Sequence, residues 1–141
     1  MHGDQPEWLE KGDIVHFQRL LVEEHGGLHG IRDEGALEST LARPMQLLHY
    51  QADASIFELA ASYGYGFARN HVFNDGNKRV SLASIDIFLQ INGFQLDAQE
   101  VDAVLTIRDV ATGELKESGL AGWIKTNSSC FDLDSVSRDS E

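Results

Sequence analysis

The sequence predicts an all-α domain on three grounds. The only prolines are Pro6 and Pro44, so long helical segments run without interruption. Apolar residues recur at helical spacing through most of the chain. Glycine, asparagine and aspartate residues separate these segments where helices are expected to start and stop. At 141 residues, the chain has the size of one domain with a core of its own.

The first half of the chain predicts two helices and an irregular segment. The first helix is expected from about Lys11 to Glu24, ending at His25-Gly26-Gly27, with an apolar stripe of Ile14, Phe17, Leu20 and Leu21. Asp33 is a good N-cap for a short helix to about Ala42. Because proline disfavours the helical conformation in the residue before it, Pro44 predicts a break. We interpret Arg43 to Ala54, which has no clean period, as a loop or a short hairpin.

The second half predicts four more helices. Ser55 caps the first of them, whose apolar face is Ile56, Leu59, Ala60, Tyr63 and Phe67. Gly64 and Gly66 in this helix favour close packing against a neighbour. The helix from about Asn77 to Asn92 is apolar on most sides, which is typical of the middle of a bundle. Asp97 to Glu100 matches a capping box for a helix to about Val110, and a last helix carries Leu115, Leu120, Trp123 and Ile124.

The chain is expected to divide into a folded domain, residues 1–126, and an acidic, disordered tail, residues 127–141. The formal net charge is −12, from 23 acidic and 11 basic residues. Because phosphate neutralisation dominates nucleic-acid affinity, no direct nucleic-acid partner is expected, although a local basic patch is compatible with this composition. No segment approaches the roughly 18–20 apolar residues that cross a bilayer. With no signal peptide and a single cysteine, Cys130, we expect a cytoplasmic protein without a membrane partner.

The residues with the most chemistry stand in one run, His71-Val72-Phe73-Asn74-Asp75-Gly76-Asn77-Lys78-Arg79. They directly precede the apolar run Val80 to Ile91, so the pattern indicates a loop that enters a buried helix. A helix begins with backbone N–H groups that have no helical partner and with the positive end of its dipole. The sequence therefore predicts an anion site here, with a base and a carboxylate beside it.

Each residue of this cluster has a catalytic and a structural interpretation. A neutral His71 imidazole can accept a proton from a hydroxyl group near neutral pH. Asp75 either caps the turn or holds Mg²⁺ against phosphate oxygens. Asn77 either caps the helix or positions a ligand, while Lys78 and Arg79 either neutralise phosphate or are ordinary solvated cations. The proximity of these groups favours the catalytic interpretations.

The string from His71 to Arg79 closely resembles the signature of the Fic/Doc family, HxFx[D/E]GN[G/K]R, at all seven defined positions. Gly26 to Gly35 is similar to the loop before the second helix in the death-on-curing (Doc) branch, and Ala111 to Glu114 is similar to its late turn. The resemblance covers residues 11–126. It implies a Fic/Doc-type helical bundle with a buried central helix and a short flap, either hairpin or loop.

Within this resemblance, Lys78 separates the branches of the family. Members that transfer AMP have Gly at this position and a second Arg where this chain has Leu82, and the Doc branch has neither feature. Resemblance to the Doc branch implies a toxin that phosphorylates a threonine or serine hydroxyl of a translation factor, such as elongation factor Tu, with ATP. Two positions, Gly76 and Ala83, depart from the Doc branch.

The resemblance also implies roles for individual residues. His71 would be the base on the target hydroxyl and Asp75 the Mg²⁺ ligand. Residues 76–79, namely Gly76, Asn77, Lys78 and Arg79, would form the anion hole, and Arg69 would assist with phosphate. The irregular segment would be a flap that docks the target strand through backbone hydrogen bonds, with Arg43, Gln46, Leu47 and Leu48 as its contact residues.

The sequence lacks the inhibitory-helix string [S/T]xxxE[G/N] found in many family members, because Gly30 stands four residues before Glu34. By analogy, inhibition would come from a separate antitoxin protein. The leading hypothesis is a Doc-like toxin kinase that uses ATP and Mg²⁺. Two alternatives stay open, namely AMP or other nucleotidyl transfer to a protein hydroxyl, and a non-catalytic member that binds a nucleotide or a partner.

Overall fold

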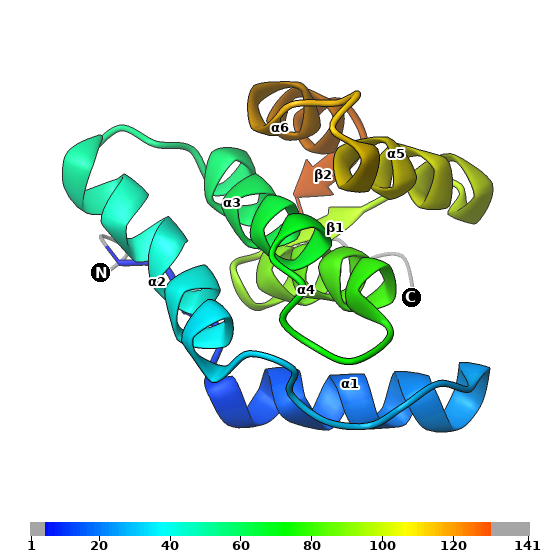
Figure 1. Cartoon of the computed structure of the whole chain (residues 1–141). Coiled ribbons are helices and arrows are strands. Elements are labelled where there is room, and N and C mark those ends of the chain that lie inside the picture. The colour runs from blue at the N-terminus through cyan, green and yellow to red at the C-terminus, as the bar shows by residue number, and fades with distance from the viewer. Residues whose placement is uncertain (1–4, 131–141) are drawn as a thin grey trace, which may run out of the picture.

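The computed structural model describes residues 5–130, which form six helices and two short strands (Figure 1). In chain order they are α1 (Lys11–His25), α2 (Glu34–Tyr50), α3 (Ile56–Arg69), α4 (Asn77–Ile91), β1 (Phe94–Leu96), α5 (Glu100–Thr112), α6 (Glu117–Thr126) and β2 (Ser128–Cys130). The predicted all-α class is confirmed, with the addition of a small antiparallel pair formed by β1 and β2. Within residues 5–130 no helix combines the length and apolar character that spanning a membrane requires.

Helix α3 occupies the centre of the fold and contacts α2, α4, α5 and α6. Small residues make this possible. Gly64 packs directly on Ile85 of α4, and a Cβ added to Gly66 would lie 2.7 Å from Thr40 Cγ2 of α2. The close packing predicted at both glycines is therefore confirmed. Helix α4, expected to be a central one, packs against α1, α3, α5 and β1, and all its residues from Val80 to Leu89 are buried or half-buried. Its fully buried residues are Val80, Ser81, Ser84, Ile85, Phe88 and Leu89.

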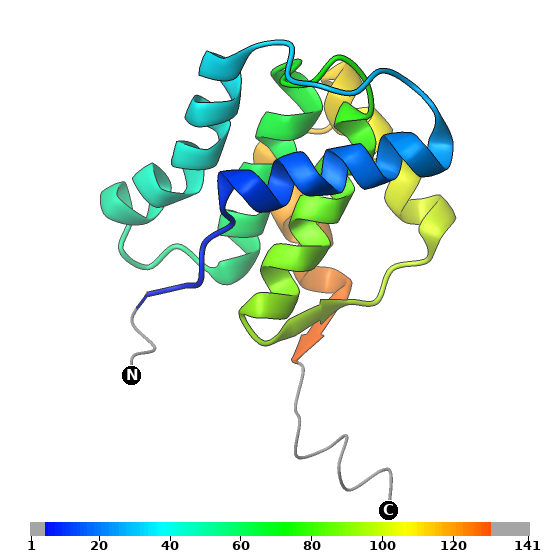
Figure 2. The same ribbon diagram turned by 90° about the horizontal axis from the view of Figure 1, so that it is seen from below.

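The buried face of α1 differs from the predicted apolar stripe. Its buried residues are Ile14, Gln18 and Val22, spaced four apart, whereas Leu20 is 46% exposed. Figure 2 shows α1 lying across α4, with which it is in contact. The prediction followed apolar character alone and missed the face because a buried glutamine occupies its centre.

Helix α2 contradicts the predicted loop or hairpin, because it continues through Pro44 to Tyr50. A proline inside a helix removes one hydrogen bond and crowds the preceding turn. Tertiary contacts offset this cost here. Pro44 is buried, and the Arg43 guanidinium donates to Ser62 O at 2.9 Å and to Glu117 Oε1 at 2.7 Å. The segment predicted as a flap is therefore mostly helix, and the non-helical connection to α3 spans only residues 51–55.

Two predictions about element ends have different outcomes. The cap at Ser55 is confirmed as a full capping box with Glu58. The capping box predicted at Asp97 is absent, because α5 has Gln99 at its N-cap, without a side-chain bond, and the Asp97 N–H donates to Asn127 O at 2.6 Å. Beyond residue 126, the predicted end of the domain, the chain continues as β2 to Cys130 and pairs with β1. The rest of the predicted tail, residues 131–141, lies outside the described residues.

Candidate active site

The motif loop, residues 70–76, connects α3 to α4 and is anchored by two apolar side chains. Val72 and Phe73 are fully buried, and the Phe73 ring stacks on Phe67 of α3 with centroids 6.3 Å apart. His71, directly before these anchors, and Asp75, after them, are both exposed. His71 has a φ of +50°, which is uncommon for a residue other than glycine. The loop is therefore anchored in the core, and it exposes the predicted catalytic base, His71, and the carboxylate of Asp75 to solvent.

The Asn77 side chain braces this loop. Its Oδ1 accepts from Phe73 N at 2.9 Å, and its Nδ2 donates to Phe73 O at 2.9 Å. The helix cap itself is Gly76, in the left-handed conformation with a φ of +80° and without a side-chain cap. The Asn77 side chain therefore does not cap α4, which was one of its two interpretations from the sequence. Both ends of the amide instead fix the turn that leads into α4.

A second loop lies against the motif loop. This glycine loop, residues 26–32, connects α1 to α2, and the two loops run side by side in Figures 1 and 2. The Asn74 N–H donates to Gly30 O, the Asn74 side chain donates to His29 O, both at 3.1 Å, and Ile31 forms an antiparallel bridge with Phe73. The glycine loop thus supports the motif loop through these hydrogen bonds.

Asp75 is held by the glycine loop. Its Oδ2 accepts from Leu28 N at 2.7 Å, and Gly27 packs against its Cβ. Among the described residues no group of three or more His, Cys, Asp or Glu side chains could form a metal cage. Mg²⁺ fits a single carboxylate when substrate phosphates and water supply its other ligands. The exposed Asp75 carboxylate fits that arrangement, because the Leu28 N–H occupies only one of its two oxygens.

The start of α4 opens into a cavity of about 610 Å³, which we call the motif hollow. It brings together four predicted site residues, Gly76, Asn77, Lys78 and Arg79, with residues of α1 and α5. The first intrahelical acceptor is Gly76 O, bonded by Val80 N, so the preceding N–H groups of α4 have no helical partner. These groups, the helix dipole and the two cations together favour an anion in the hollow.

Sequence reasoning missed the far wall of the motif hollow. That wall comes from α1 and α5 and includes His25, Glu100, Val104, Ile107 and Arg108. A smaller adjoining hollow of about 380 Å³ continues along α4 and reaches Ala83 and Asp86. Burial raises the pKa of the Asp86 carboxyl, and a hydrogen bond from Gln90 opposes that shift. No local pattern marks the α5 residues, because only the packing of α5 on α4 brings them to the motif.

His71, Asp75 and Arg69 do not line the motif hollow. The Arg69 guanidinium instead donates to Val110 O at 3.2 Å and to Ala111 O, at the end of α5. It also lies 5.7 Å from the Tyr65 ring centroid, and Arg43 lies 5.4 Å from the same centroid. Both arginines are thus engaged in contacts within the protein: Arg69 joins α3 to α5, and Arg43 joins α2 to α3 and α6.

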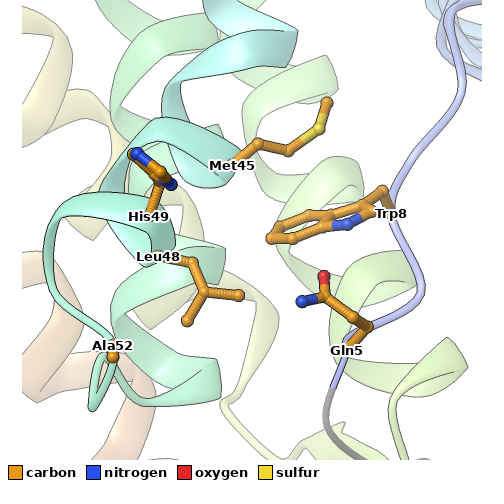
Figure 3. A pocket seen from close by; sticks show the side chains of 6 residues that line it. All are labelled: Gln5, Trp8, Met45, Leu48, His49 and Ala52. Atoms are coloured by element: carbon orange, nitrogen blue, oxygen red, sulfur yellow. The ribbon is translucent and has the colours of Figure 1, made fainter.

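The remaining predicted flap residues belong to α2, and their backbone groups lie within a helix, which leaves them unable to pair with a target strand. Gln46 is exposed and Leu47 packs against the core. Leu48 lines a separate hollow of about 490 Å³ between α2 and the segment before α1. Figure 3 shows Trp8 and Gln5 facing Met45, Leu48 and His49 across it.

With the site in view, comparison with known proteins identifies the family. A family model described as "Fic/DOC family" matches residues 8–89, a segment that contains α1 to α3, both loops and α4 up to Leu89. The chain belongs to the Fic/DOC family. Two relatives from this family are similar over most of their length. One, named "Protein kinase doc", from Escherichia phage P1, is 38% identical over 114 residues, which cover 80% of this chain and 89% of that protein.

The second relative, named "Toxin Doc", from Mycolicibacterium smegmatis, is 36% identical over 119 residues, which cover 82% of this chain and 88% of that protein. Membership of the Fic/DOC family agrees with the helical fold and with the motif at the start of α4. The α5 residues of the motif hollow lie beyond residues 8–89, the segment that the family model matches.

Proposed function

We propose that this protein is the toxin of a toxin–antitoxin pair and that it phosphorylates a threonine or serine hydroxyl of a translation factor, such as elongation factor Tu, with ATP. The observation that carries the proposal is Lys78 within an otherwise intact motif, at the mouth of an anion-binding hollow. The names of the two relatives, a protein kinase and a toxin, support it. Such a target would place the protein in the cytoplasm, where a separate antitoxin would restrain it.

Each residue of the site has a separate role in the proposed phosphoryl transfer. The exposed His71 imidazole accepts the proton of the target hydroxyl as its oxygen attacks the γ-phosphorus of ATP, and ADP leaves. Lys78, Arg79 and the free N–H groups of α4 hold the phosphate oxygens in the motif hollow. Asp75 would hold Mg²⁺, which neutralises charge on the phosphates when it is bound. The Asn77 amide keeps the loop that carries His71 and Asp75 in register with α4.

The direct test is incubation of the protein with elongation factor Tu and either γ-labelled or α-labelled ATP. Phosphoryl transfer predicts label on the target from the γ position alone. Label from the α position alone would establish nucleotidyl transfer instead. Absence of label from both positions, together with absence of growth arrest on induction, would favour a non-catalytic member of the family.

His71→Ala is expected to abolish growth arrest and label transfer while the fold is retained, because the exposed side chain contributes a proton acceptor and little packing. His49→Ala, a change at another exposed histidine on α2 away from the motif, is the matched control and should keep full activity. Thermal unfolding of both variants checks the fold. Growth arrest by His71→Ala at the parent level would show that His71 is not the base.

A further inference from the structure

We propose that Gln18, a buried residue of α1, positions the Asp75 carboxylate, an inference that rests on the proposed function in its assignment of Asp75 to Mg²⁺. Gln18 is 2% exposed and sits at the middle of the buried face of α1. It belongs neither to the motif nor to the motif hollow. Its side chain reaches both loops of the site and holds them together.

The Gln18 amide uses both of its polar ends. Nε2 donates to Leu28 O at 3.2 Å and to Asp75 O at 3.1 Å, while Oε1 accepts from Gly30 N at 3.4 Å. An amide can donate two hydrogen bonds from its nitrogen, and both go to the two loops. One side chain thus joins the glycine loop to the motif loop at the residue that carries the carboxylate.

A further hydrogen bond connects this network to the Asp75 side chain. Leu28, whose carbonyl is held by Gln18, donates its own N–H to Asp75 Oδ2 at 2.7 Å. Gln18 therefore constrains Asp75 twice, directly through the Asp75 backbone carbonyl and indirectly through the backbone of Leu28. Groups that orient a metal ligand through a hydrogen bond of this kind tune metal affinity although they do not touch the metal.

The choice of residue supports a positioning role over simple filling of the core. An apolar side chain would satisfy the same buried face, which Ile14 and Val22 complete one turn away on each side. A buried amide is unfavourable unless its hydrogen bonds are made. The buried hydroxyls of Ser81 and Thr106, by contrast, bond within or between helices, to Gly64 O and to Asp102 O. The partners of Gln18 lie only in the two loops.

The test compares Gln18→Met, which keeps the length of the side chain and removes its polar atoms, with Thr106→Val, which removes a buried hydroxyl of α5. Both variants are expected to lose some stability, because each removes hydrogen bonds that a buried side chain donates to a carbonyl. Only Gln18→Met is expected to raise the Mg²⁺ concentration needed for half-maximal ATP binding, by about tenfold. Isothermal titration calorimetry on the full chain measures this, with ATP held constant while Mg²⁺ is varied.

A measurement independent of function is hydrogen exchange at the Leu28 amide, followed by NMR. In Gln18→Met this exchange should accelerate by about fivefold, the effect of losing one hydrogen bond, and in Thr106→Val it should not change. Unchanged exchange at Leu28 in Gln18→Met would overturn the inference, as would an equal Mg²⁺ shift in both variants. Faster exchange in a protein whose parent form shows no Mg²⁺-dependent ATP binding would support the positioning of Asp75 and count against the proposed function alone.

Discussion

At the residue scale, Gly27 determines how closely the glycine loop approaches the motif. Its φ is +114°, a conformation that side chains rarely adopt, and a Cβ built on it would lie 2.9 Å from Asp75 Cβ. Asp75 can accept the Leu28 N–H only because the chain passes this near. Glycine is thus required at this position both by the positive φ and by the close approach of Asp75.

Replacement of Gly27 by alanine is expected to lower the free energy of unfolding by about 1–3 kcal/mol, because the strained φ and the close contact act together. Gly122→Ala provides the control. Gly122 lies within α6 with nothing within 4 Å of its missing Cβ, so alanine there should stabilise the fold by about 0.5–1 kcal/mol. Urea unfolding measures both changes. A stabilised Gly27→Ala variant would contradict the packing described for this loop.

Asp75→Asn isolates the charge of the carboxylate. The asparagine carbonyl can still accept the Leu28 N–H, so the fold should keep its stability. Mg²⁺-dependent ATP binding should nevertheless weaken, because a neutral amide is a poorer ligand for Mg²⁺ than a carboxylate. Calorimetric titration compares the variant with the parent and with Asp53→Asn, an exposed position outside the motif. A Mg²⁺ response identical to the parent's would remove Asp75 from its proposed role.

The site residues that lie in one continuous run of sequence could be predicted, and those that the tertiary fold brings to that run could not. His71, Asp75 and residues 76–79 could be recognised because one short string carries their chemistry. Gln18 could not, because an isolated glutamine in a helix gives no sign of burial or of partners 10 and 57 residues away. Arg69 was assigned to phosphate by resemblance, whereas its guanidinium contacts the end of α5 through a tertiary fold that the local sequence does not encode.

At the element scale, helix ends show which sequence signals are decisive. Ser55 and Glu58 form reciprocal side-chain bonds at the start of α3. Asp97 and Glu100 have the same spacing, but β1 and its pairing with β2 draw the Asp97 backbone toward Asn127, and α5 starts later. A competing strand pair overrode the local motif there. Contacts of Arg43 similarly overrode the helix-breaking signal of Pro44 in α2.

Substitution at the two predicted caps should separate a formed cap from an unformed one. Ser55→Ala is expected to lower the free energy of unfolding by about 1 kcal/mol, because the Glu58 N–H loses its acceptor. Asp97→Ala should change it by less than about 0.5 kcal/mol, as for an exposed residue without a side-chain cap. Chemical unfolding monitored by circular dichroism measures both. Equal losses would show that Asp97 does cap α5 in solution.

At the scale of the whole molecule, the segment before α1 is fastened to the centre of the fold. Leu9 N donates to the Tyr63 hydroxyl at 3.1 Å, and Trp8 stacks on Phe88 with centroids 6.0 Å apart. Glu7 exchanges two backbone hydrogen bonds with the Asn92 side chain. Burial raises the pKa of Tyr63 to about 12, and the bond from Leu9 opposes part of that shift.

The raised pKa makes the fold sensitive to alkaline pH. Tyr63 is neutral when protonated, so its contribution to stability is complete below its unfolded pKa of 10.0 and is lost as pH rises through about 12. The loss should amount to roughly 2–3 kcal/mol, since each pKa unit corresponds to about 1.4 kcal/mol. Urea unfolding between these pH values should therefore show a steeper decline for the parent than for Tyr63→Phe. Parallel pH profiles would mean that Tyr63 does not resist ionisation.

The fold class followed from helical spacing and from the scarcity of proline, because these act on every segment at once. The arrangement of segments was less accessible. The sequence predicted α4 as a central helix for its apolar character, and α4 packs against α1, α3, α5 and β1. The central place of α3 was not predicted, although Gly64 and Gly66 let neighbours approach its backbone. Proximity of this kind depends on which helices meet, and apolar patterning alone does not specify that.

The pairing of β1 with β2 also gives the protein a convenient chemical handle. Cys130, the only cysteine in the sequence, is exposed and stands opposite Phe94, just beyond the end of α4. The motif lies at the start of that helix, about 22 Å away along its axis. A maleimide dye attached to the native thiol would therefore report on association with a target or an antitoxin by fluorescence anisotropy, without an engineered cysteine and without crowding the motif.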